Sequence, residues 1–286
     1  MSVVFTMPGK MGDALLQWPV AFHYGQQVGD FEVWMDEGSC KPLVPLFEAQ
    51  PHVTKVKLIG GIDNYNCGGQ PFHFELPTSA FEGNTIYHLG LRSFPQRQIS
   101  LETLTNSKVP VKVPVELFAE TPSIVPESVT KANRLVLHGQ GVCPHNRQTP
   151  TFWKFIAGIR KELETTFDEI VFVGSPRDLE VAQNTYPLWK TFSDGGDFRV
   201  LADYLSGSRA MIGCGSGPIT LAGAMKLPSI RVHDPIGDGK GAPKVIWDNL
   251  GDNQLNDTEV GLRKSWAVWR DKWLSHKDVD SVAAKS

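Results

Sequence analysis

Apolar positions along this chain alternate between the spacing of buried strands and the spacing of helices. Short apolar runs typical of buried strands lie at 2–6, 31–35, 55–59, 85–89, 134–138, 169–173, 210–212 and 229–233. Helical periodicity is found between them, at 13–26, 42–47, 151–164, 177–184 and 198–206, and a further short helix is predicted from Pro218. Since strands that alternate with helices form parallel sheets with crossover helices, the pattern predicts an α/β fold in two halves.

The two halves are separated by residues 108–130, which carry four prolines and no helical period, and this segment is the predicted linker. We therefore expect a first domain at 1–120 and a second at 131–257. Residues 62–83 are rich in Gly, Pro and aromatic residues and are predicted to be loop. In the remainder, 258–286, a helix is predicted near 258–275. Its Leu262, Trp266, Trp269 and Trp273 recur at three- and four-residue steps, so this helix is expected to pack back on the body of the protein.

Composition narrows the classes of protein that fit. Of the 286 residues 41% are apolar, enough for a core, and the net charge of −3 argues against a protein that coats nucleic acid by bulk electrostatics. The four cysteines form no CxxC pair, and neither a secretory signal nor an integral membrane segment is evident. We expect a soluble, cytoplasmic protein. Zinc sites at Cys67 with His73 and at Cys143 with His145 are rejected, because the ligands lack paired spacing.

A glycine turn lies near the end of the second half, between a predicted strand and a predicted helix. Gly213, Gly215, Ser216 and Gly217 keep it narrow and leave backbone N–H groups uncovered, and Pro218 suits the first turn of a helix. Because a helix N-terminus carries partial positive charge, the turn is a candidate anion site; the alternative is a tight turn with no ligand. A second glycine turn, residues 8–13, follows the first strand. Two such turns predict two nucleotide-type domains that face each other across a cleft.

These two segments resemble signatures of a known family. Residues 12–19, Gly-Asp-Ala-Leu-Leu-Gln-Trp-Pro, and residues 206–222, with their Gly-Ser-Gly-Pro turn, resemble the N- and C-terminal signatures of the heptosyltransferase-like glycosyltransferases of family 9. The resemblance implies the GT-B fold, in which two Rossmann-like domains face each other across a cleft. It implies that the C-terminal domain binds a nucleotide sugar and the N-terminal domain an acceptor, with inverting transfer that needs neither a metal nor a further cofactor.

The resemblance also implies roles for individual residues. Asp13 falls at the position of the general base, and Ser216, Gly217 and Thr220 fall where the family grips the donor diphosphate. Two departures stand out, because Gly215 replaces the family's Asp and Thr220 its His. The family's Lys-Trp-Pro segment is also replaced, and Arg147 can stand in for its cation.

Each candidate also has a plain structural interpretation. An Asp in the first turn of a helix favours the macrodipole whatever its function. Lys10 and Gly12 are candidate contacts for the acceptor or for a phosphate, and the alternative for Lys10 is a solvated loop lysine. His138 ends a strand at the edge where open α/β sheets bind ligands, yet a strand-end histidine is often a hydrogen-bonded structural group. The candidate donor-binding set is His138, Gly139, Arg147, Gly174, Ser175, Gly215, Ser216, Gly217 and Thr220.

Two other functions stay open. Gly213-Cys-Gly215 after a strand, with Asp234 about 20 residues on, imitates the fingerprint of an NAD-dependent oxidoreductase, although Pro218 occupies the place of the third glycine. The departures at 215 and 220 are also compatible with a catalytically inactive nucleotide-binding relative.

The acceptor hydroxyl is expected on a lipopolysaccharide-type saccharide or on a modified DNA base. For DNA, Arg92, Arg97, Lys108 and Lys112 would form a modest groove, with binding that weakens as salt rises. The oligomeric state is not predicted.

Overall fold

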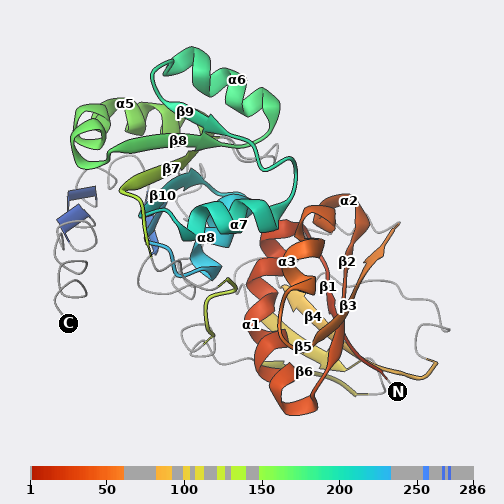
Figure 1. Cartoon of the computed structure of the whole chain (residues 1–286). Helices are drawn as coiled ribbons and strands as arrows, with labels where there is room; N and C mark the ends of the chain where they lie inside the picture. Colours follow the sequence, from red (N-terminus) through yellow and green to blue (C-terminus); the bar gives the residue numbers. More distant parts are fainter. Residues whose placement is uncertain are drawn as a thin grey trace, which may run out of the picture.

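The computed structural model describes residues 2–60, 82–91, 99–103, 107–112, 121–125, 130–139, 148–232, 254–257, 266–267 and 270–271. They form two six-stranded sheets, each in its own half of the molecule (Figure 1). This confirms the predicted mixed α/β fold with parallel sheets, and the domain limits themselves stay a prediction.

The first sheet has the strand order β3-β2-β1-β4-β5-β6. Its strands are β1 (Ser2–Met7), β2 (Phe31–Asp36), β3 (Val53–Ile59), β4 (Asn84–Leu91), β5 (Ile99–Thr103) and β6 (Ser107–Lys112). β3, β2, β1 and β4 run parallel, whereas β5 and β6 add antiparallel. The accompanying helices are α1 (Met11–Val28), α2 (Glu37–Cys40), the 3-10 turn η1 (Lys41–Leu43) and α3 (Val44–Glu48).

The second sheet has the order β12-β11-β10-β7-β8-β9, and all its pairs are parallel. Its strands are β7 (Arg134–His138), β8 (Glu169–Val173), β9 (Lys190–Phe192), β10 (Ala210–Cys214), β11 (Ser229–Val232) and β12 (Gln254–Asp257). Its helices are α5 (Gln148–Thr166), α6 (Pro176–Thr185), α7 (Phe198–Ser206) and α8 (Gly217–Ala224).

Both sheets follow the same doubly wound order. From one edge to the other, each half arranges its strands third, second, first, fourth, fifth, sixth. The order reverses between the first and fourth strands, which are β1 and β4 in one half and β7 and β10 in the other. In open α/β sheets ligands bind outside the carboxyl ends of the strands at this reversal. The topology therefore predicts a ligand site at the turns that follow β1, β7 and β10.

One hydrophobic cluster crosses from one half to the other. It contains buried residues of the first half, such as Phe5 and Leu16, together with Leu201 and Leu221 of the second. α7 and α8 lie against α3 and α1 (Figure 1). As a result α1 is buried on every side over residues 14–21, including Gln17, because the sheet covers one flank and α8 another. A second cluster, with Phe152, Ile156 and Phe172 among its members, fills the space beneath α5.

Three expectations about secondary structure need correction. Residues 108–112 of the region predicted as linker belong to the edge strand β6, and β5 and β6 break the expected parallel pattern. The strands β5, β9 and β12 were not predicted, since three to five residues are too few to show a clear period.

The described residues of the segment predicted as a C-terminal helix, 266–267 and 270–271, include one that packs on the second half. There Trp266 belongs to the cluster under α5 and its indole N–H donates to Glu162 Oε2 at 2.7 Å.

Candidate functional site

The two predicted glycine turns meet at the seam between the halves. A Cβ on Gly12, in the first turn of α1, would lie 3.4 Å from Thr220 Oγ1 of α8. A Cβ on Gly217, at the start of α8, would lie 3.4 Å from Met11 Cβ. Since β1 leads into α1 and β10 leads into α8, the reversal points of the two sheets are brought face to face. The sequence predicted this juxtaposition; the cleft itself stays a prediction.

Asp13 is held in a fixed direction by the turn that precedes α1. Gly9 has φ +106°, a conformation that L side chains rarely adopt, and the next N–H, of Lys10, donates to Asp13 Oδ2 at 2.9 Å. A Cβ on Gly9 would lie 2.7 Å from Asp13 Cβ, so only glycine fits against this carboxylate. Asp13 is half-buried, and by accepting from the backbone N–H of the N-cap residue Lys10 it helps to cap its own helix.

The same capping arrangement occurs at α6, away from the seam. The Ser175 N–H donates to Asp178 Oδ2 at 3.0 Å, and a Cβ on Gly174 would lie 2.9 Å from Asp178 Cβ. In this protein an aspartate at the third position of a helix therefore stabilises the helix N-terminus whether or not it also takes part in catalysis. What distinguishes Asp13 from Asp178 is its place beside α8.

Cys40 supports the same turn and was missed in the sequence. Its thiol is buried and donates to the Gly9 carbonyl, with Sγ and O 3.6 Å apart. Burial, with the negative charges of Asp36 and Asp13, raises the pKa of Cys40 to about 12, so the group stays a neutral thiol. No local pattern marks a cysteine between two short helical turns, and only the tertiary fold brings it to Gly9.

The start of α8 differs from the starts of its neighbours. Ser216 is the N-cap residue, but its hydroxyl donates to the Cys214 carbonyl at 3.1 Å and does not cap the helix. In α6 and α7 the caps Ser175 and Asp197 do accept a backbone N–H. The first turn of α8 therefore lacks the side-chain acceptor that would compete with a bound anion.

Several glycines of this site are required by packing. A Cβ on Gly139 would lie 2.8 Å from Phe152 Cε1, and one on Gly217 would lie 3.1 Å from Phe198 Cζ. At Gly213 a Cβ would lie 3.4 Å from His138 Cβ, which is close to an ordinary contact, so packing requires glycine less strictly there. Packing thus explains Gly139 and Gly217 without a ligand.

Thr220 does not point out of the turn. It is fully buried, its hydroxyl donates to the Ser216 carbonyl at 3.0 Å, and it faces Gly12. Gly215 is buried as well. Both positions at which the chain departs from the family signature are thus buried, and since Thr220 lies in the contact between α1 and α8, its predicted contact with phosphate requires these helices to separate.

The remaining donor candidates gather at the carboxyl ends of β7 and β8. His138 is buried, and its Nδ1–H donates to the Val173 carbonyl at 2.9 Å, because a carbonyl can only accept. This is the structural role considered for a strand-end histidine. Gly174 and exposed Ser175 follow at once. Other residues named in the sequence lie outside the described part of the chain: Arg147, Asp234, Arg92, Arg97 and the four residues of the rejected zinc sites, together with the side chains of Lys108 and Lys112.

Solved structures share this architecture. A family 9 glycosyl transferase from Veillonella parvula superposes with a TM-score of 0.56 at 13% identity, covering 95% of this chain and 88% of its own. The E. coli heptosyltransferase WaaC with ADP gives 0.57 at 13% identity, with 94% and 100% covered. The E. coli ADP-heptose lps heptosyltransferase II gives 0.56 at 12% identity, with 95% and 99% covered.

The fold is that of the GT-B glycosyltransferases. At this level of identity the likeness concerns the fold and not the substrate. No protein-family model matches the sequence, and no curated protein matches it by sequence. In the part of the chain that the structure describes, every helix is too short or too polar to cross a membrane.

Proposed function

We propose that this chain is an inverting, metal-independent glycosyltransferase that moves a sugar from a nucleotide sugar to an acceptor hydroxyl. The observation that carries the proposal is the contact between the first turns of α1 and α8, because Asp13 belongs to one of these turns and the other begins without a side-chain cap. The solved structures of like fold include one with ADP and one with an ADP-linked fluoroheptose, both in the E. coli enzyme WaaC.

The reaction divides between the two turns. Asp13 takes the proton of the acceptor hydroxyl as its oxygen attacks the anomeric carbon of the donor sugar. The bond from that carbon to the diphosphate oxygen breaks, and the nucleoside diphosphate leaves with the electron pair. The backbone N–H groups and partial positive charge at the start of α8 stabilise the developing anion. Lys10, at the start of α1, adds a cation. Attack opposite the leaving group inverts the configuration.

Exchanging Asp13 for Asn tests the role of the base. The amide oxygen of Asn can still accept the Lys10 N–H, so the helix cap is retained while the base is lost. We expect transfer to fall by about 10²–10⁴-fold, with nucleotide affinity measured by calorimetry nearly unchanged. Asp178→Asn makes the same change in the matching cap of α6 and is expected to leave transfer intact. Full activity of Asp13→Asn would show that the base has been misassigned.

The same assay addresses the competing functions. Nucleotide binding by the unaltered protein without turnover of any donor would favour an inactive relative, which the uncharged Gly215 and Thr220 support as a second candidate. An NAD-dependent oxidoreductase is disfavoured, because the glycine turn follows β10, the fourth strand of its sheet, whereas the dinucleotide fingerprint follows the first. Transfer that is insensitive to a chelator is expected for the metal-independent mechanism.

The acceptor is proposed to be a saccharide of the lipopolysaccharide type. A modified DNA base is the other candidate, and it predicts binding to duplex DNA that weakens steeply as salt rises. Binding of a DNA duplex that does not depend on salt would contradict the electrostatic groove.

A further inference from the structure

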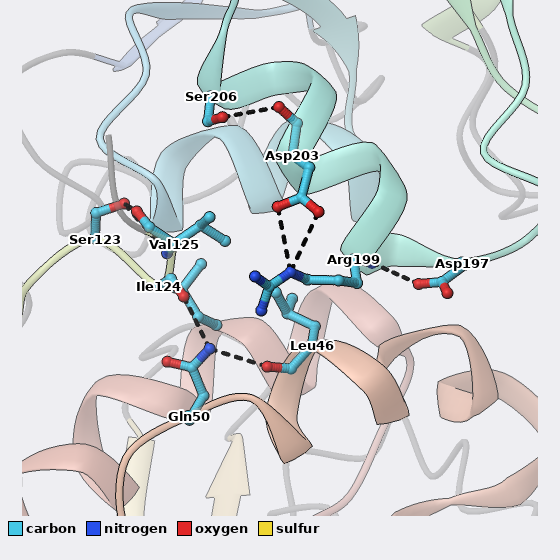
Figure 2. A network of polar contacts seen from close by, with 9 residues as sticks. All are labelled: Leu46, Gln50, Ser123, Ile124, Val125, Asp197, Arg199, Asp203 and Ser206. Carbon is cyan, nitrogen blue, oxygen red and sulfur yellow. Dashed lines mark hydrogen bonds and ion pairs between the residues drawn. The ribbon is translucent and has the colours of Figure 1, made fainter. Parts of the chain in front are cut away.

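A short segment between the two halves is bonded to both of them. This segment, Thr121–Val125, is called the bridge below, and Figure 2 shows it between α3 and the second half. On the side of the first half, Gln50 Nε2 donates to the Ile124 carbonyl at 2.8 Å and to the Leu46 carbonyl at 2.9 Å. One amide therefore joins α3 to the bridge, and the half-buried Gln50 holds the Ile124 carbonyl in place.

The N–H of the same residue, Ile124, is bonded to α8. The Ile124 N–H donates to the carbonyl of Ala224, the last residue of α8, at 3.2 Å. The Ser123 hydroxyl lies 2.5 Å from the Val125 carbonyl within the bridge and 3.2 Å from the Met225 carbonyl, so its single hydrogen is directed mainly at Val125. The side chains of Ile124 and Val125 are buried in the hydrophobic cluster that crosses the seam. The bridge thus connects α3 with the C-terminal end of α8.

α8 transmits this attachment to the candidate site. It is a helix of eight residues, about 12 Å long, and its other end carries Gly217 and Thr220 against α1. Because a helix moves as a rigid element, a displacement at Ala224 is carried to the contact between α8 and the turn that holds Asp13. A misplacement of about 1 Å can lower a rate by about 10²-fold.

We propose that Gln50 is a positioning residue, which, through Ile124 and α8, sets the placement of the donor-side turn against Asp13. The catalytic part of this inference rests on the proposed glycosyl transfer. The mechanical part does not, because it concerns the coupling between Gln50 and α8 in the protein without substrate.

Gln50→Met tests the coupling, since it keeps the length of the side chain and removes both N–H donors. Hydrogen exchange of the full-length protein, without ligand, is compared for peptides that span 217–225 and 11–14. We expect faster exchange in both, by about fivefold for each net hydrogen bond lost. Gln50→Lys, which retains N–H donors at a similar reach, is expected to restore the slow exchange. Gln183→Met makes the same change on exposed α6 and is expected to have no effect there.

The kinetic measurement separates positioning from a general loss of structure. With a nucleotide-sugar donor, Gln50→Met is expected to lower kcat by about tenfold or more while the Kd for the nucleoside diphosphate stays within about twofold. Exchange that is faster in 121–125 but unchanged in 217–225 would overturn the proposal, as would an equal effect of Gln183→Met. If Gln50→Met fails to fold, Gln50→Ala, which also removes both N–H donors, decides in the same way. A failure of all variants and of the unaltered protein to transfer sugar would overturn the proposed function alone.

Discussion

Replacing Gly9 with Ala perturbs the turn that orients Asp13 in two separable ways. The first is conformational, because φ +106° is rarely adopted by residues with a Cβ. The second is steric, because the new methyl would lie 2.7 Å from Asp13 Cβ and 2.8 Å from Asp13 Oδ2. Asp13 is anchored at one end by α1 and at the other by the Lys10 N–H. Relief of the clash therefore has to weaken that hydrogen bond.

Gly29→Ala isolates the conformational part. Gly29 ends the same helix with φ +87°, and nothing lies within 4 Å of its hypothetical Cβ. Strain of this kind costs about 1–3 kcal/mol, and we expect each variant to lose that much free energy of unfolding. Loss of a helix cap costs about 0.5–2 kcal/mol more. Gly9→Ala should therefore destabilise the protein by about 1 kcal/mol more than Gly29→Ala does.

The assay is unfolding in urea at equilibrium, with transfer measured on the same preparations. We expect Gly9→Ala to be the less stable variant and to lose transfer activity, because the carboxylate is displaced, whereas Gly29→Ala keeps its activity. The reasoning is refuted if the two variants agree in stability within about 0.5 kcal/mol or if Gly9→Ala transfers sugar at the unaltered rate.

Three further predictions concern the rest of the fold. Gly25→Ala improves helix propensity, but its Cβ would lie 2.1 Å from Phe31 Cε1. We therefore expect it to lower the free energy of unfolding, measured in urea, by about 1–3 kcal/mol. Adding Phe31→Leu to this variant should recover part of the loss. The side chains of Lys190 and Arg134 hold the pKa of Glu169 below its ordinary value, so the stability that this carboxylate contributes is present above its unfolded pKa of about 4.3 and is lost as pH falls through the folded one. Glu169→Gln should then lose less stability than the unaltered protein when thermal unfolding is followed from about pH 6 to pH 3, and identical slopes would contradict this. Glu162→Ala removes the carboxylate oxygen that accepts from the Trp266 indole N–H at 2.7 Å. It should lower the free energy of unfolding by about 1–3 kcal/mol and speed proteolysis of the C-terminal segment. An unchanged rate of cleavage would show that this hydrogen bond does not hold the segment.

Much of the fold was available from the sequence because its determinants are local. Period-2 and period-3.6 patterns and the glycine turns depend on residues close together in the chain, and they predicted β1, α1, β7, β10 and α8 at nearly their observed limits. The expected stripe of α5, Phe152, Phe155, Ile159 and Leu163, is buried throughout. The repeated alternation also predicted two sheets and hence two turns that face each other.

The tertiary structure decided what these elements touch. The periodic Trp266 was expected to be buried, but its partner Glu162 lies 104 residues away, and no local pattern selects it. Gln50 and Ile124 are 74 residues apart and Cys40 and Gly9 are 31 apart, so their contacts exist only once the sheets are assembled. α1 shows the same limit, because its burial on every side comes from α8 and not from its own sequence. The sequence by itself thus determined the elements and the two turns, whereas packing between distant segments decided how the first turns of α1 and α8 are held against each other.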